Sequence, residues 1–250
     1  MEVPILTYHS IDNSGSIIST SLETFRRQMT ILSEDGYKVV PLNSIVDDLR
    51  TRRSFQSKTV VLTFDDGFEN FYTDAYPVLD MYGFTATVFL VTDFCGGYNE
   101  WEGERLSLPR KPLLSWKQAK ELSSLGIEFG SHTRTHPDLT RITAEQLDEE
   151  IGGSKAAIED ALGTSVNTFA YSYGLFDSSV KEIVKENFGA ACSVKLGKVR
   201  TNSDPFVLER IDCYYLSNPK MFRSVSSKPI DYYLQFRQNL RDLKAFAQRA

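Results

Sequence analysis

Short apolar runs of strand length alternate with helical patterns along almost the whole chain of 250 residues. Such alternation predicts βαβ units, whose parallel strands are buried on both faces. The runs that we expect to be strands are residues 3–7, 37–41, 59–64, 85–91, 127–131, 169–171, 190–194 and 207–214. No Pro/Gly/Ser-rich linker, repeat or low-complexity segment interrupts them. The pattern favours a single α/β domain over residues 1–250, built as a closed or nearly closed parallel β/α barrel; a doubly wound open sheet is the alternative.

Helix start and stop signals lie between these runs. Capping-box spacing, in which Glu or Gln follows Ser or Thr after three residues, occurs at Thr20 with Glu23, Ser115 with Gln118 and Thr143 with Gln146. Glycines in the usual C-terminal position end these helices at Gly36, Gly126 and Gly163. Further helices are expected over 45–50, 72–81 and 179–187. A final amphipathic helix is expected from apolar residues spaced by 4, 3 and 4, namely Phe236, Leu240, Leu243 and Ala247.

Charge and cysteine content exclude several classes of protein. The chain has 28 Lys and Arg against 33 Asp and Glu, a net charge of −5, so it lacks the basic excess that attracts nucleic acid or anionic lipid. The three widely spaced cysteines indicate free thiols rather than a disulfide framework or a thiolate zinc site. No run approaches the roughly 18 apolar residues of a transmembrane helix, and the N-terminus lacks a signal-peptide pattern. We therefore expect a soluble cytoplasmic protein.

Two adjacent carboxylates, Asp65 and Asp66, follow the apolar run 60–62. They stand at the C-terminal end of an expected strand, where active sites of barrels and α/β sheets lie. Neighbouring residues leave a strand end in different directions, so one carboxylate can bind a metal while the other accepts a proton from water. The alternative is a turn or a helix N-cap, for which Asp-Asp-Gly is ordinary.

His132 and His136 follow the expected strand 127–131 and are two of only three histidines in the chain. Pro137 disfavours helical backbone at His136, and Thr133 stands where a zinc protease helix would have Glu. We therefore expect a loop that directs both imidazoles toward one point. Two histidines with one carboxylate form a common metal-ligand set with open positions for water and substrate. The alternative is two solvated loop histidines.

The third histidine, His9, closes the first expected strand. In isolation it could equally be a structural histidine. An imidazole with a pKa of about 6.5 can also protonate a departing amine near neutral pH. Because all three histidines and both carboxylates fall at expected C-terminal strand ends, they indicate one site.

One long irregular stretch, residues 92–113, contains Tyr98 and Trp101. Loops of this length in a compact domain are usually functional or disordered. The two aromatic side chains favour a lid over a site that binds substrate through Trp101; a solvated insertion is the alternative.

Together these motifs resemble the polysaccharide deacetylase family, carbohydrate esterase family four, which shares the NodB homology domain. The resemblance extends from about Leu6 to about Ile211. It rests on three motifs, which read Thr63-Phe64-Asp65-Asp66-Gly67, Ser131-His132-Thr133-Arg134-Thr135-His136 and Phe169-Ala170-Tyr171-Ser172-Tyr173-Gly174. The fold that it implies is a distorted (β/α)7 barrel.

The resemblance also implies roles for individual residues. Asp65 would be the catalytic base, and the backbone N–H of Tyr173 would help to bind the oxyanion and the substrate. A divalent metal, most often Zn2+ with Co2+, Ni2+ and Mn2+ as alternatives, would be held by Asp66, His132 and His136.

The chain departs from the family pattern in three places. It has no histidine after His136, where many members carry their acid in a late Leu-x-x-His motif. His9 instead resembles the acid of members whose last motif is moved to the N-terminus by circular permutation. Ala170 and Ser172 replace an Arg that braces the base and a Pro. We hypothesise that Arg210 supplies the missing guanidinium; a surface ion pair is the alternative.

The function that the resemblance implies is metal-dependent N-deacetylation of an N-acetylated sugar in a polysaccharide, an oligosaccharide or a glycan precursor, with release of acetate. One rival is a metal-dependent hydrolase of a non-sugar linear amide or formamide, which the same ligands would serve. Another is an inactive carbohydrate-binding or scaffold protein. Loss of the metal ligands or of His9 would be the signature of an inactive protein, and the sequence retains them all.

Overall fold

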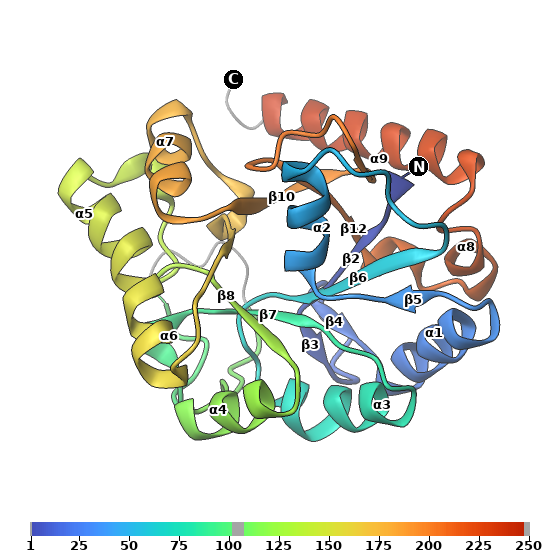
Figure 1. Cartoon of the computed structure of the whole chain (residues 1–250), viewed down its shortest axis with the longest axis horizontal. Helices are drawn as coiled ribbons and strands as arrows, with labels where there is room; N and C mark the ends of the chain where they lie inside the picture. The colour runs from blue at the N-terminus through green and yellow to red at the C-terminus, as the bar shows by residue number, and fades with distance from the viewer. Residues whose placement is uncertain (1, 102–107, 248–250) are drawn as a thin grey trace.

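Seven parallel strands close into a barrel in the computed structural model, which describes residues 2–101 and 108–247 (Figure 1). Each strand pairs in parallel with its neighbours, and the ring closes through pairing of the strand Ile5–Tyr8 with the strand Thr59–Phe64. The order around the barrel is β2 (Ile5–Tyr8), β12 (Leu208–Asp212), β10 (Ala190–Leu196), β9 (Thr168–Ala170), β8 (Glu128–Ser131), β7 (Thr87–Leu90) and β6 (Thr59–Phe64). The expected (β/α)7 barrel is confirmed, and the open-sheet alternative is wrong.

Short strands and helices complete the described part of the chain. The remaining strands are β1 (Glu2–Val3), β3 (Ser10–Ile11), β4 (Ser19–Thr20), β5 (Lys38–Val39) and β11 (Val199–Arg200). The α-helices are α1 (Leu22–Glu34), α2 (Leu42–Arg50), α3 (Tyr76–Met81), α4 (Trp116–Ser124), α5 (Ala144–Asp148), α6 (Ser154–Leu162), α7 (Ser178–Asn187), α8 (Pro219–Arg223) and α9 (Lys228–Ala247). The π-helical segments are η1 (Phe71–Ala75) and η4 (Glu149–Gly153), and the 3-10 turns are η2 (Thr92–Phe94), η3 (Leu139–Arg141), η5 (Ser172–Gly174) and η6 (Cys213–Leu216).

Strand β6 shows why these strands read as continuous apolar runs. All six of its residues are buried. Successive side chains of a strand point to opposite faces, so Val61 packs inside the barrel while Val60 and Leu62 pack against the surrounding helices. The barrel interior is also closed from one end by α2, whose backbone N–H groups bond Thr87 and Glu128 at the starts of β7 and β8. The other end of the barrel, where the C-terminal ends of the strands lie, is the end that carries the candidate site residues.

The helix signals are confirmed at two of the three capping boxes, those of Ser115 and Thr143. The third is wrong by one residue. Ser21, not Thr20, caps α1 by accepting the backbone N–H of Thr24, because Thr20 belongs to β4 and pairs with Ile11. Tertiary pairing of the short strand thus decides the cap.

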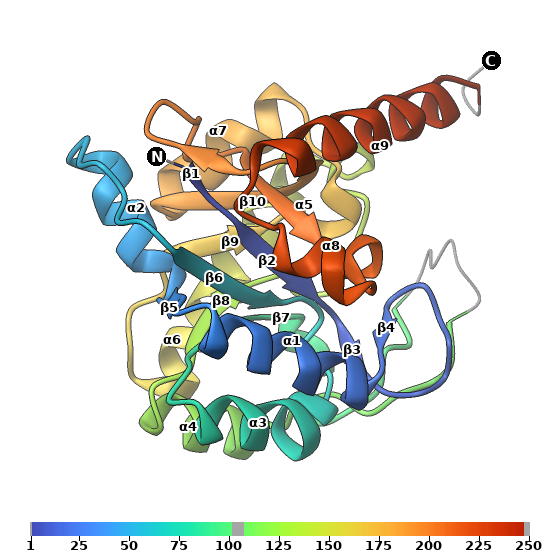
Figure 2. The ribbon, with the colours of Figure 1, turned by 90° about the vertical axis from the view of Figure 1, so that its right-hand side faces the viewer.

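The expected C-terminal helix is confirmed, but its apolar stripe does not pack on the barrel. Phe236, Leu240 and Leu243 are exposed, while the side chain of Ala247 lies outside the described part. Gln238 and Arg241 bond backbone groups of β10 instead, so this part of α9 turns polar side chains to the barrel, whereas Ile230 and Leu234 nearer its start are buried. Figure 2 shows the helix extending past the strands. Within the described residues, no helix has the length and apolar character needed to cross a bilayer.

A glycine in β8 provides a test of the barrel packing. Gly130 lies opposite Phe89 of β7, and a Cβ at Gly130 would come within 2.5 Å of that ring and 2.8 Å of Thr168 Oγ1. We expect Gly130→Ala to lower the free energy of unfolding by about 1–3 kcal/mol, because the packed core must shift to accept a methyl group. Urea denaturation measures the change.

The matched control is Gly152→Ala in η4, where a Cβ would meet only Asn187 Oδ1, at 3.4 Å. We expect that variant to keep its stability or to gain up to about 1 kcal/mol from helix propensity. Equal stability of the two variants would contradict the packing argument.

Candidate active site

The predicted site residues meet at the C-terminal end of the barrel. His9 follows β2, Asp65 and Asp66 follow β6, and the histidine loop follows β8. A cavity of about 110 Å³ is lined by His9, Ile18, Asp65, Asp66, Trp101, Leu108, His132, His136, Tyr171, Tyr173 and Val194. One site is therefore assembled from segments spread over most of the chain.

Asp66, His132 and His136 form a buried group suited to a metal ion. Their ligand atoms lie within 4.8 Å of one another. The Nε2 atoms of His132 and His136 lie 3.5 and 3.6 Å from Oδ1 of Asp66. Burial raises the pKa of Asp66, but the hydrogen bond with His132 and the charges of the nearby imidazoles outweigh burial, so the pKa is lowered and Asp66 stays ionised. One carboxylate and two imidazoles converging on one point match a common ligand set for divalent metal ions, with open positions.

Neighbouring groups orient both imidazoles. Nδ1 of His132 donates a 2.7 Å hydrogen bond to the carbonyl of Ala170, which leaves Nε2 directed at Asp66. The ring of His136 packs against Trp101 and against Tyr173, with centroid distances of 4.7 and 4.4 Å.

The protonation of the two imidazoles also suits a cation. Burial and the charge of His132 lower the pKa of His136 to about 3, so its ring is neutral, as a ligand must be. Burial also lowers the pKa of His132, but the hydrogen bond with Asp66 and the charges of Asp65 and Asp66 outweigh it, so the pKa is raised. A cation at this point would take the place of that proton. Within the described residues, the buried Nδ1 of His136 has no hydrogen-bond partner. The fit to the implied metal rests on the other nitrogen, because the Nε2 atoms of His132 and His136 and Oδ1 of Asp66 face one point.

Four site residues adopt left-handed backbone conformations. The φ angles are 71° at Asp66, 72° at Thr133, 61° at His136 and 55° at Tyr173. Non-glycine residues rarely adopt this conformation, which costs of the order of 1–3 kcal/mol each. Such strain persists where the surrounding structure requires a particular side-chain direction. The sequence prediction of a loop at His136 is confirmed; the backbone conformation that aims the ring was not predicted.

Arg210 holds Asp65 in a bidentate pair. Its Nη1 and Nη2 atoms donate to the two carboxylate oxygens at 2.7 and 2.8 Å, and its Nε donates to the carbonyl of Ser193 at 2.9 Å. Arg210 is only 3% exposed, so the alternative of a surface ion pair is wrong. Burial raises the pKa of Asp65, but the charge and hydrogen bonds of Arg210 outweigh it and hold the pKa well below its usual value. The carboxylate is thus ionised at neutral pH.

His9 occupies the more open side of the same carboxylate. Its Nε2 atom lies 3.9 Å from Oδ2 of Asp65, and its side chain is 24% exposed. Asp65 therefore lies between Arg210 and His9. The next residue, Asp66, belongs to the candidate metal-ligand group. This arrangement places a candidate proton acceptor and a candidate proton donor in one cavity.

Trp101 forms part of the wall of the cavity and is 4% exposed. Two limbs of the segment 92–113 bond each other, for example through Asn99 N–H with the carbonyl of Lys111 and Leu113 N–H with that of Gly97. The buried Trp101 does not fit the solvated-insertion alternative, whereas Tyr98, Glu100 and Arg110 of the same segment are exposed. Residues 102–107 lie outside the described residues, and the role of the segment as a lid stays a prediction.

Sequence reasoning missed the groups that act through the backbone. The carbonyls of Ala170 and Ser193 orient His132 and Arg210, yet a carbonyl is present at every residue and carries no sequence signal. Thr133 was noted only as a departure from zinc proteases, although its Oγ1 accepts the backbone N–H of His136 at 2.9 Å.

Comparisons with known proteins agree with this geometry. The family model for polysaccharide deacetylase matches residues 52–188. Over 211 residues the chain is 28% identical to YxkH of Bacillus subtilis, which carries a polysaccharide deacetylase name, covering 84% of this chain and 71% of that protein. It is 26% identical over 203 residues to the poly-beta-1,6-N-acetyl-D-glucosamine N-deacetylase of Staphylococcus aureus, covering 77% and 67%.

Solved structures show the same fold. The Streptococcus pyogenes deacetylase PplD, in complex with acetate, superposes with a TM-score of 0.79 at 24% identity, covering 90% of this chain and 98% of that one. BC0361, a polysaccharide deacetylase from Bacillus cereus, superposes with a TM-score of 0.75 at 27% identity, covering 90% and 69%. The motifs, the seven-stranded barrel and the family match together show that this chain belongs to the polysaccharide deacetylase family.

Proposed function

We propose that the protein is a metal-dependent N-deacetylase that hydrolyses the acetamide of an N-acetylated sugar in a polysaccharide, an oligosaccharide or a glycan precursor and releases acetate. One observation carries the proposal: a buried Asp66–His132–His136 group shares a cavity with an ionised carboxylate, Asp65, and an imidazole, His9. Relatives named for deacetylation of N-acetylglucosamine polymers support the substrate class.

The metal group would occupy the point on which Asp66, His132 and His136 converge. We propose Zn2+, with Co2+, Ni2+ and Mn2+ as alternatives, because two imidazoles and one carboxylate suit these ions. When bound, the cation would supply a Lewis acid that polarises the acetamide carbonyl and acidifies water.

The residues of the chain would move the protons. Asp65, ionised and held by Arg210, accepts a proton from the attacking water. A carboxylate with a depressed pKa is a weak base, which a cation held by Asp66, His132 and His136 would offset by making water more acidic. His9 in its protonated form donates a proton to the sugar nitrogen as the C–N bond breaks. The backbone N–H of Tyr173 would donate to the oxyanion, a contribution of about 3–4 kcal/mol for one well-placed donor.

Trp101 and Tyr173 would bind the substrate. Both rings contact the His136 ring, and both line the cavity. An acetyl methyl group between aromatic rings would be shielded from water, which strengthens the electrostatic interactions around the carbonyl.

Two substitutions separate metal binding from turnover. We expect His132→Ala to abolish metal content and activity together, because it removes one of three ligands. Asp65→Asn should retain metal and lose turnover, because an amide cannot accept the proton. Metal analysis by mass spectrometry and acetate release from N-acetylglucosamine oligomers measure the two effects.

Full activity of either variant would overturn the assignment. Acetate release by the unaltered protein from a simple amide, but from no sugar oligomer, would favour the non-sugar amide hydrolase. Release from neither kind of substrate would favour the inactive binding protein.

The acid role of His9 has a separate test. We expect His9→Gln to lower acetamide hydrolysis about 100- to 10,000-fold, because the amine cannot leave without a proton. Hydrolysis of an activated aryl acetate ester should change only a few-fold, because its phenolate leaves unprotonated. Steady-state rates on both substrates measure this split, and an equal loss on both would contradict the acid role.

The effect of Arg210 on the ionisation of Asp65 can be tested in the pH profile of kcat/KM. Because the pKa of Asp65 is depressed in the folded protein, its charge stabilises the fold above the unfolded pKa of about 3.9, and this contribution is lost only as pH falls through the lower folded value. In Arg210→Met, burial acts without the guanidinium, so the pKa of Asp65 should rise. The acid limb of kcat/KM should move to higher pH, and stability should fall by about 3–5 kcal/mol.

Arg210→Lys, which keeps a cation, is the control and should shift the acid limb less. An acid limb at the same pH in Arg210→Met and in the unaltered protein would show that the pair does not set the ionisation of Asp65.

A further inference from the structure

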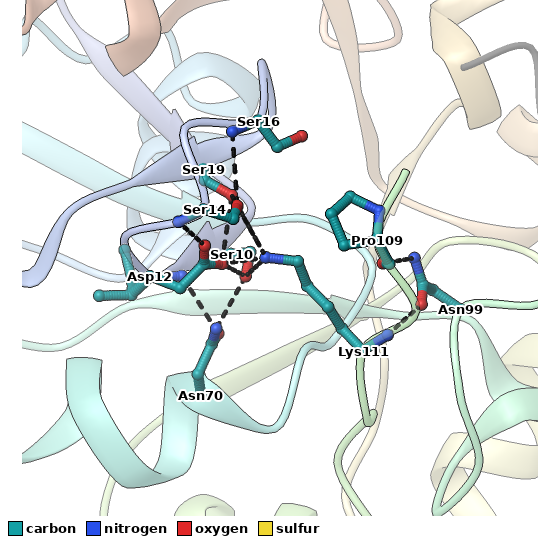
Figure 3. A network of polar contacts seen from close by, with 10 residues as sticks. Ser10, Asp12, Ser14, Ser16, Ser19, Asn70, Asn99, Pro109 and Lys111 are labelled. Carbon is teal, nitrogen blue, oxygen red and sulfur yellow. Dashed lines mark hydrogen bonds and ion pairs between the residues drawn. The ribbon is translucent and has the colours of Figure 1, made fainter. Parts of the chain in front are cut away.

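Lys111 lies outside the set of predicted site residues, yet its ammonium group is enclosed by oxygen atoms (Figure 3). Nζ pairs with Oδ2 of Asp12 and donates to the hydroxyls of Ser10, Ser19 and Ser14 at 3.2, 3.3 and 3.4 Å. The Lys111 side chain is 11% exposed. An ion pair held at this degree of burial by several hydrogen bonds restricts the segments that it joins more than an exposed pair does.

The segment that Lys111 holds directly follows His9. Asp12 also accepts the hydroxyl of Ser10 and the backbone N–H of Ser14, so residues 10–14 wrap around one carboxylate. Burial raises the pKa of Asp12, but the hydrogen bonds of Lys111, Ser10 and Ser14 hold it below its usual value. The carboxylate that organises this turn is thus charged at neutral pH.

The same network reaches two other segments of the site. Asn70, which follows the Asp65–Asp66 turn, donates to the Ser10 hydroxyl at 2.7 Å and accepts the backbone N–H of Ile11 at 3.1 Å. On the other side, the backbone N–H of Lys111 donates to Asn99 Oδ1 at 2.6 Å, two residues before Trp101. Figure 3 shows these contacts meeting around Ser10 and Lys111. The segments that carry the acid, the base and the aromatic wall are therefore joined at one point.

His9 needs such support because its imidazole ring makes few polar contacts of its own. Within the described residues, its imidazole has one charged contact, the 3.9 Å approach to Asp65, and no hydrogen bond. The direction of the ring therefore depends on the main chain and on the side chains that pack around it. Tyr8 is fixed before it, since Tyr8 is buried in β2 and its hydroxyl donates to Gln28 at 2.9 Å. After it, the chain leaves the barrel at Ser10.

We infer that Lys111 is a positioning residue for the general acid: by holding Ser10 and Asp12, it fixes the direction in which His9 presents its imidazole to the sugar nitrogen. The inference rests on the proposed function for the role of His9. Proton transfer requires a heavy-atom distance of about 2.6–3.2 Å. A misplacement of about 1 Å can lower a rate about 100-fold. Loss of Lys111 should therefore impair the step that needs the acid and spare the step that does not.

The kinetic experiment compares Lys111→Met with the unaltered protein on an acetamide and on an activated aryl acetate ester. We expect the amide rate to fall at least about 10-fold while the ester rate and the metal content stay within about two-fold. Asp12→Asn removes the other charge with little change in volume and should have the same effect. The double variant should lose little more than either single variant, because both act through one contact.

Arg110→Met is the matched control. Arg110 neighbours Lys111 on the same segment and also pairs with an acid, Glu100, but both side chains of this pair are 56% exposed. We expect its ratio of amide to ester rates to equal that of the unaltered protein. A normal ratio in Lys111→Met, an equal loss on both substrates or a loss of metal would overturn the inference.

A second measurement does not depend on any substrate. The chain has only three histidines, so ¹⁵N-histidine labelling yields a spectrum of three imidazoles. In Lys111→Met, and not in Arg110→Met, we expect the His9 signal to shift or broaden while the signals of His132 and His136 stay in place. An unchanged His9 signal, or a change in all three, would contradict the inference. Absence of amide hydrolysis in the unaltered protein would instead contradict the proposed function. The histidine spectrum does not test that function, so the two failures can be told apart.

Discussion

The buried pair of Asp65 and Arg210 is the interaction on which the site depends. Taking two charges out of water costs several kcal/mol for each, and mutual attraction offsets this only with good geometry and additional hydrogen bonds. Both conditions hold, since the pair is bidentate and Nε of Arg210 donates to Ser193. The pair also joins β6 to β12, strands that are separated in the barrel by β2. Removing either charge would leave the other buried without its partner, so the pair constrains three neighbouring strands together.

Backbone strain at the C-terminal end of the barrel arises because the site side chains must point in particular directions. Asp65 and Asp66 are adjacent, yet one faces Arg210 and the other faces the two histidines. The left-handed conformation of Asp66 makes this divergence, and those of Thr133 and His136 turn the second imidazole back toward the first. Strain of this kind is kept only where packing imposes it. At His136 the packing comes from two residues that are distant in sequence, Trp101 and Tyr173.

Predictions from the sequence were accurate where the signal is local. The bounds of β6 were predicted to the residue, because apolar and β-branched residues fill the whole segment from Thr59 to Phe64 and all six are buried. The site residues could be predicted because C-terminal strand ends meet at one edge. Prediction failed where distant contacts decide. Pairing with β3 moved the cap of α1 to Ser21, and bonds from the polar face of α9 to β10 left Phe236 exposed. No local pattern could have joined Lys111 to Asp12, since 99 residues separate them.

The position of β2 explains how a histidine near the N-terminus can serve a site built mainly from later strands. Strand β2 lies between β6 and β12, so His9, the residue after it, emerges beside Asp65, the proposed base, which Arg210 of β12 holds from another side. Parallel pairing of Tyr8 with Phe64 brings His9 level with Asp65. In a closed barrel the place of a strand around the ring, and not its order along the chain, decides which side chains meet. An acid carried by the first barrel strand is therefore as well placed for Asp65 as one carried by the last, provided that the chain beyond it is held in place.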